Sequence, residues 1–212
     1  AGSGVSGFSG TMTVSPSSST VVDPASWTRH FSDFASARML SEAYRASSTG
    51  SVADVAARTF PLACPPSSTP ENIAAFIAAQ LSAERFGEYL RDPDRAVFVA
   101  HDDARILGYT MLIRGVADDA DVQRAVPERP AVELSKCYVL PDVHGGDVAA
   151  TLMDASVAYA RELGARCVWL GVNQENKRAQ RFYRKHGFEV TGTKTFQLGA
   201  RTESDYVLVR PL

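Results

Sequence analysis

The sequence has 212 residues, of which 45% are hydrophobic, and its 22 basic and 24 acidic residues give a net charge of −2. This length and apolar content suit one globular domain with a sizeable core. The near-neutral charge, spread along the chain, argues against nucleic acid as a partner. No apolar run reaches the ~18 residues of a membrane span, and the three cysteines lack CxxC spacing, so we expect a cytoplasmic protein with no membrane partner.

Residues 1–41 are predicted to form a Ser- and Gly-rich N-terminal extension. Sixteen of the first 30 residues are Gly, Ser or Thr, a composition that cannot bury enough apolar surface to order itself. The segment beginning at Phe31, "FSDFASARML", is expected to be a short helix before the domain. The domain itself is assigned to residues 42–212, and "AYRAS" at 43–47 is a candidate first strand.

The next part of the domain predicts helices followed by a hairpin. In the first helical segment, apolar residues recur at helical spacing behind Ser51. The following segment opens with Thr69, Pro70 and Glu71, a capping pattern with proline at the first helical position. The pattern predicts one helix at residues 51–60 and two helices at 69–92. It then predicts a hairpin at 95–113 and one or two helical turns at 118–130.

The C-terminal half alternates strands and helices. Pro141 stops the first of these strands, and Gly164 and Gly187 close the two helices. The predicted order is strand, amphipathic helix, buried strand, helix and hairpin, at residues 131–140, 147–164, 165–172, 176–187 and 188–212. The expected fold class is α/β, with a mixed, mostly antiparallel sheet and helices on its faces.

The turn "PDVHGG" at 141–146 lies between a predicted strand and a predicted helix. Such a turn aims unpaired backbone N–H groups and the positive end of the helix dipole at one point. The pattern is therefore typical of an anion-binding cradle. An ordinary strand-to-helix connection is the alternative, because two adjacent glycines are a weak signal by themselves.

A second motif follows the next buried strand, in "NQENKRAQRFYRKHGFEV". Its characteristic residues are Asn176, Ala179, Phe182, Tyr183, Gly187 and Phe188. Together with the turn, this motif resembles the GCN5-related N-acetyltransferase (GNAT) superfamily, and within it the PaiA-like polyamine acetyltransferases. The resemblance extends over roughly residues 42–212, through "PENIAAFIAAQLSAERF", "VWLGV" and "DYVLV".

The resemblance implies a GNAT fold in which two central parallel strands, "AVELSKCYVL" and "ARCVWLGV", splay apart around the pantetheine arm of acetyl-CoA. It also implies that the pyrophosphate binds the following turn, and it implies no metal. Asn173 and Asn176 have alternative roles, as strand terminator and helix cap. The implied cofactor-binding residues are Cys137, Tyr138, Val139, His144, Gly145, Gly146, Asp147, Val148, Ala149, Asn173 and Asn176.

Asp147 departs from the superfamily pattern, which has glycine at that position. A carboxylate ~5 Å from a pyrophosphate oxygen would cost on the order of 3 kcal/mol at an effective dielectric of ~20. The favoured interpretation is that Asp147 points aside and caps the helix. Gly145 and Gly146 would then provide the close backbone approach to phosphate.

The resemblance implies that Tyr183 is the general acid and that Glu133 removes the amine proton through water. The alternatives are a core aromatic residue and a solvent-exposed carboxylate at a strand end. Cys137 and Cys167 are interpreted as packing residues rather than nucleophiles. The expected reaction is direct acetyl transfer from acetyl-CoA to a small primary amine, with polyamines among the candidates. A non-catalytic acyl-CoA sensor is the competing hypothesis, because Asp147 departs from the pattern.

The acceptor is the least determined feature of the sequence. The acidic run at 118–121, with Glu128 and Glu133, is suited to attracting a cationic amine. A solvated loop is the alternative interpretation and the favoured one. The expected partner is a small-molecule amine, and a homodimer is left open as the assembly.

Overall fold

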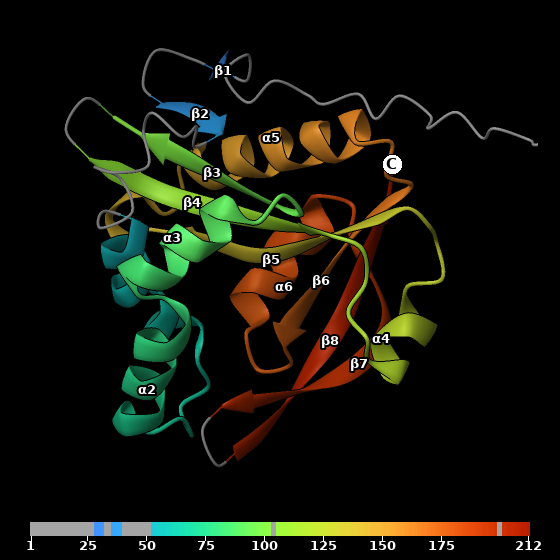
Figure 1. The fold of residues 1–212 in the computed structure, drawn as a ribbon. Helices are drawn as coiled ribbons and strands as arrows, with labels where there is room; N and C mark the ends of the chain where they lie inside the picture. The colour runs from blue at the N-terminus through green and yellow to red at the C-terminus, as the bar shows by residue number, and fades with distance from the viewer. Residues whose placement is uncertain (1–27, 32–34, 40–51, 103–104, 199–200) are drawn as a thin grey trace, which may run out of the picture.

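The structure, a computed structural model, describes residues 28–31, 35–39, 52–102, 105–198 and 201–212. Its centre is an eight-stranded sheet in the order β1-β2-β3-β4-β5-β6-β8-β7 (Figure 1). The strands are β1 Thr28–Phe31, β2 Ala35–Met39, β3 Arg95–His101, β4 Ile106–Arg114, β5 Ala131–Val139, β6 Cys167–Asn173, β7 Glu189–Leu198 and β8 Arg201–Pro211.

Helices cover the two faces of this sheet, and most of them follow the predicted periodicities. Residues 52–59 are helical, and the later elements are η2 Phe60–Ala63, α2 Pro70–Gln80, α3 Ala83–Arg91, α4 Ala120–Ala125, η3 Pro141–Val143, α5 Val148–Glu162 and α6 Lys177–Lys185. The predicted cap is confirmed, because the Thr69 side chain accepts a hydrogen bond from the Asn72 amide. No helix of the described segments is long and apolar enough to cross a membrane.

The helix expected from Phe31 is wrong, because this segment contains a strand instead. β2 pairs antiparallel with β3, with Ser36 opposite His101 and Met39 opposite Phe98. A helix this short is marginal in water by itself, whereas the edge of β3 offers backbone partners for a whole strand. The sheet therefore begins within the segment that the sequence assigned to the extension. The strand expected at 43–47 and the Ser51 cap lie outside the described residues.

The core has one layer on each side of the sheet, and β3 shows the division. Phe98 packs in the cluster beneath α5, together with Leu152 and Met153. Val97 and Val99, on the opposite face of the same strand, pack in the cluster beneath α3 and the helix at 52–59. This alternation is the period of two that a strand buried on both faces requires.

The middle of the sheet opens between β5 and β6. The two strands pair in parallel only where Ala131, Val132 and Glu133 face residues 167–169. Beyond Glu133, β5 stays paired with β4 as far as Val139, and β6 stays paired with β8 as far as Asn173. The predicted splay of the central parallel strands is therefore confirmed.

Candidate active site

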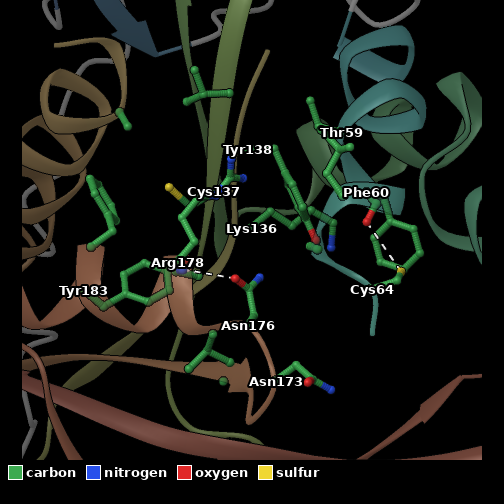
Figure 2. A pocket seen from close by; sticks show the side chains of 18 of the residues that line it. Thr59, Phe60, Cys64, Lys136, Cys137, Tyr138, Asn173, Asn176, Arg178 and Tyr183 are labelled. Atoms are coloured by element: carbon green, nitrogen blue, oxygen red, sulfur yellow. Dashed lines mark hydrogen bonds between the residues drawn. The ribbon is translucent and has the colours of Figure 1, made fainter. Parts of the chain in front are cut away.

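A cavity of about 450 Å³ lies where β5 and β6 separate. One wall is formed by α6 and the turn after β5, and the opposite wall by residues 59–65 and the C-terminal hairpin. Figure 2 shows Tyr183 on one side of Cys137 and Lys136, and Thr59, Phe60 and Cys64 on the other. The cavity therefore joins the two faces of the sheet, so two ligands can approach each other within it.

The turn after β5 reaches the cavity through His144, Gly145 and Gly146. Gly145 has a φ of 85°, a left-handed conformation that favours glycine. Nothing lies within 4 Å of an ideal Cβ at Gly145, so the backbone here is open to a ligand. The start of the 15-residue helix α5 adds unpaired amides and a partial positive charge. The turn thus has the features that a pyrophosphate requires.

Arg178 supplies a cation at this turn, although the sequence motifs did not indicate it. The Arg178 guanidinium donates to Nδ1 of His144 at 2.9 Å, and Nε2 of His144 lies 2.9 Å from the carbonyl oxygen of Val139. Both ring nitrogens of His144 are therefore engaged, which leaves Arg178 as the better anion-binding side chain. Its position directly after Asn176 and Lys177, in the first turn of α6, was the available signal.

The prediction that Asp147 caps α5 is wrong. Asp147 occupies the N-cap position, but its side chain makes no capping hydrogen bond. Its φ and ψ of −82° and −4° are helical, whereas a capping side chain reaches the following amides from an extended backbone. The exposed Asp147 is also absent from the cavity lining, as is the buried Val148. Ala149 does line the cavity.

Tyr183 lines the cavity from α6 and packs against Phe182 and Phe188, with ring centroids 5.6 Å and 5.8 Å away. Burial raises the pKa of Tyr183 well above its usual range, and the neighbouring Cys137 and Tyr138 add to the shift. The hydroxyl therefore keeps its proton at neutral pH. Tyr183 is therefore a packed aromatic residue that also lines the cavity.

Cys137 lies beside Tyr183 and also lines the cavity. Burial raises the pKa of its thiol to about 12, despite an opposing hydrogen bond with Tyr183. Since the thiolate is the nucleophilic form, Cys137 is not activated for attack. Cys167 is buried in the cluster around Trp169. Both observations agree with the interpretation of these cysteines as packing residues.

Glu133 lines the cavity at the point where β5 and β6 separate. Burial raises the pKa of its carboxyl group, while Lys194, Lys136 and Arg95 oppose the shift. A carboxylate with a raised pKa binds a proton more readily than an exposed glutamate does. The Glu133 carboxyl group therefore holds a proton at a higher pH than an exposed glutamate does.

Two asparagines combine local bonds with a place in the cavity lining. Oδ1 of Asn176 accepts a hydrogen bond from the Ala179 amide at 3.0 Å and caps α6 (Figure 2). Oδ1 of Asn173 accepts one from the Glu175 amide at 2.8 Å, just after β6. The structural alternatives for both residues are therefore present, and their remaining polar atoms are near the cavity.

The part of the cavity lined by β5, β7 and β8 carries charges that the sequence motifs did not indicate. Lys136 lines it from β5, Lys194 from β7, and Glu203 and Asp205 from β8. Burial raises the pKa of Asp205 to about 6, Lys194 opposes the shift, and Glu203 adds to it. A shifted carboxyl group in a cavity is a signature of functional sites.

Gly171 leaves room for the Lys194 side chain in this part of the cavity. A Cβ on Gly171 would overlap the Lys194 side chain and would lie 3.4 Å from a carboxylate oxygen of Asp205. The absence of a side chain on β6 thus lets Lys194 lie across the strand beside Asp205.

The acidic segment 118–121 does not line the cavity, and neither does Glu128. The Asp119 side chain caps α4, Asp121 pairs with Arg124, and Glu128 pairs with Arg166. These acids have surface roles, as the favoured interpretation of a solvated segment expected. Among the described residues, no group of three His, Cys, Asp or Glu side chains is placed to hold a metal ion.

Comparisons with known proteins agree with this geometry. The model of the acetyltransferase (GNAT) family matches residues 57–188. An uncharacterised N-acetyltransferase of Mycobacterium tuberculosis is 58% identical over 161 residues, which cover 76% of this chain and 96% of that protein. The crystal structure of PaiA N-acetyltransferase from Thermoplasma acidophilum with coenzyme A has a TM-score of 0.64 at 19% identity, and the match covers 84% of this chain and 99% of that one. The chain therefore belongs to the GNAT family, as an N-acetyltransferase that uses acetyl-CoA.

Proposed function

We propose that the chain transfers the acetyl group directly to a small primary amine, which enters the cavity from the side of residues 59–65. The observation that carries the proposal is the pair formed by Tyr183 and Glu133. Both line the same cavity at the opening of the sheet, and the directions of their pKa shifts suit an acid and a base respectively.

In the proposed reaction, Glu133 accepts the proton of the incoming ammonium group through water. The neutral amine then attacks the thioester carbonyl, whose oxygen is stabilised by a backbone amide among residues 137–139. The C–N bond forms as the C–S bond breaks, and Tyr183 donates its proton to the leaving thiolate. General acid catalysis of this kind is typically worth 10²–10⁴-fold in rate.

The acetyl-CoA molecule is proposed to occupy the α6 side of the cavity. Its pyrophosphate would contact the amides of residues 144–149 and the guanidinium of Arg178, and its pantetheine arm would pass between β5 and β6. Gly145 and the start of α5 support this placement, because they expose backbone donors at the cavity. Asp147 is not part of the proposed contact.

The acceptor is proposed to be a cationic amine, with polyamines as the first class to test. Glu133, Glu203 and Asp205 give the acceptor side three carboxyl groups, and such groups concentrate cations in a low-dielectric cleft. Retention of both Tyr183 and Glu133 at the cavity makes a non-catalytic acyl-CoA sensor the less favoured function.

The test is a screen of primary amines with acetyl-CoA, followed by the release of free thiol. Tyr183→Phe should lower turnover about 10²-fold and leave acetyl-CoA affinity within a few-fold. Tyr206→Phe, at a β8 residue outside the cavity lining, is the matched control and should keep full activity. Absence of thiol release with every amine would contradict the proposed acceptor class. Equal turnover of the two variants would remove Tyr183 from the mechanism.

A further inference from the structure

We propose that Lys136 is itself an acetyl acceptor, so that the chain acetylates its own Nζ amine from acetyl-CoA when no amine substrate is present. The inference rests on the use of acetyl-CoA and on the position of Lys136 in the cavity. It does not depend on which external amine is the substrate.

The position of Lys136 differs from that of the exposed lysines. The 212-residue sequence has only four lysines, at positions 136, 177, 185 and 194. Lys177 and Lys185 are exposed on α6 and do not line the cavity. Lys136 lines it from β5, three residues after Glu133 and next to Cys137, which faces Tyr183 (Figure 2). Lys136 therefore contributes to the wall of the cavity in which acetyl transfer is proposed to occur.

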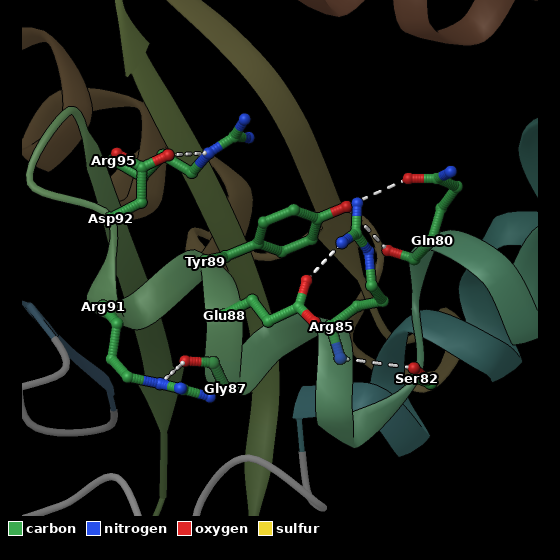
Figure 3. Close-up of polar contacts among 9 residues, drawn as sticks. All are labelled: Gln80, Ser82, Arg85, Gly87, Glu88, Tyr89, Arg91, Asp92 and Arg95. Atoms are coloured by element: carbon green, nitrogen blue, oxygen red, sulfur yellow. Dashed lines mark hydrogen bonds and ion pairs between the residues drawn. The ribbon is translucent and has the colours of Figure 1, made fainter.

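The ring of Tyr89 and its neighbours define the environment of the Lys136 amine. Nζ of Lys136 lies 5.3 Å from the ring centroid. Arg85 and Arg95 approach the same ring, with Cζ 5.3 Å and 4.8 Å from the centroid. The Tyr89 hydroxyl is fixed by Gln80, to which it hydrogen-bonds at 3.2 Å (Figure 3). Three cations therefore share one aromatic ring.

Burial favours the neutral form of this amine. The pKa of Lys136 is lowered to about 8, chiefly by burial, while Glu133 opposes the shift and Arg95 and Arg85 add to it. Each guanidinium also has an acidic partner, because Arg85 pairs with Glu88 and Arg95 with Asp92. An ordinary lysine, with a pKa of about 10.4, is almost fully protonated at pH 8. Lys136 is instead a competent nucleophile under mild conditions.

The chemistry balances with the groups already present. The lone pair of Nζ attacks the thioester carbonyl carbon, the C–N bond forms, and the C–S bond breaks. The amine proton passes to Glu133 or to water, and the leaving thiolate takes one proton. One acetyl-CoA is consumed for each amide formed, and one free CoA thiol is released.

The experiment incubates the full chain with acetyl-CoA alone and maps acetyl groups by peptide mass spectrometry. Lys177 and Lys185 serve as internal controls within the same molecule. We expect Lys136 to acquire acetyl at least tenfold faster than either control in the folded chain, with a rate that rises through about pH 8. In urea, where the cavity is lost, the lysines should react at similar slow rates.

Two variants sharpen the test. Lys136→Arg keeps the positive charge but cannot form the amide, so it should abolish the fast adduct. Lys185→Arg, on the exposed surface of α6, should leave that adduct unchanged. An unmodified Lys136, or a rate no faster than that of Lys177 and Lys185, would overturn the proposal. Thiol release with an external amine, measured on the same preparation, reports separately on the proposed function.

Discussion

Gly108 offers a direct test of how β4 and β5 are packed beside the cavity. Gly108 faces Val139 across the β4–β5 pair. An ideal Cβ at Gly108 would lie 2.7 Å from the carbonyl oxygen of Tyr138 and 3.1 Å from Cα of Val139. These are backbone atoms, so they can yield only if β5 itself moves. Gly108→Ala should therefore displace the end of the strand that lines the cavity.

The expected cost of Gly108→Ala can be set from general values. Overpacking typically costs 1–3 kcal/mol, and replacing glycine by alanine recovers roughly 0.4–1 kcal/mol where the backbone permits it. The net loss should be about 1–2 kcal/mol, or a fall in Tm of roughly 2–8 °C for a chain of this size. Because Tyr138 and Val139 line the cavity, acetyl-CoA affinity should also fall several-fold.

Gly87→Ala is the matched control, with the opposite expected sign. Gly87 lies within α3 (Figure 3), and its added Cβ would meet only the Arg91 guanidinium at 3.5 Å. In a helix, alanine is better than glycine by about 0.8–1 kcal/mol, so this variant should be more stable. Urea unfolding and calorimetric titration with acetyl-CoA measure both variants. A Gly108→Ala protein as stable as the parent would refute the argument from backbone contact.

Three further predictions concern the base, the helix start and the core. Glu133→Gln should remove the acidic limb of the pH–rate profile. Because the pKa of Glu133 is raised, this limb should lie at a higher pH than the pKa of a free glutamate would give. A loss of rate that is the same at all pH values would indicate a binding role instead. Asp147→Gly should change the free energy of unfolding by only a few tenths of a kcal/mol and the acetyl-CoA affinity by less than tenfold. The reason is that the Asp147 side chain is exposed and makes no capping hydrogen bond. A larger, salt-sensitive gain in acetyl-CoA affinity in calorimetric titration would place the carboxylate at the pyrophosphate. Thr110→Val should cost about 1 kcal/mol in urea unfolding, because it breaks the buried 2.9 Å bond to Ser156; the double variant with Ser156→Ala should lose less than the sum, and full additivity would show that the bond contributes nothing.

Much of the fold could be predicted because most elements bury one face and so carry a clear period. The α5 pattern, with Leu152 and Met153 on its buried side, is an example. The separation of β5 from β6 could not be predicted from periodicity, because each strand has an unbroken strand pattern in the sequence. It came from the family resemblance. β2 was missed because the edge of β3, rather than any local preference of residues 35–39, determines its conformation.

The candidate site was predicted on its donor side better than on its acceptor side. Glycines in a strand-to-helix turn can be recognised in the local sequence, and so can the spacing from Asn176 to Tyr183. The local sequence gives no such signal for Lys194, Glu203 and Asp205, because polar residues that alternate along a hairpin are typical of a solvated face. Their burial depends on how the hairpin and the helices close over the cavity. For Asp147 the local sequence was misleading. Aspartate is a favourable capping residue, but its helical backbone conformation here prevents the side chain from capping α5.

The separation of β5 from β6 has a consequence for how this enzyme can diversify. Beyond Glu133, one edge of β5 has lost its strand partner, so its main-chain donors and acceptors are available to a ligand. A donor substrate bound through the main chain places little demand on which side chains the strand carries. The side chains at 136 and 138 are then free to vary with the acceptor, while the proposed base at 133 is kept. Substitutions there can redirect the enzyme to a new amine while its recognition of the acetyl donor is inherited intact.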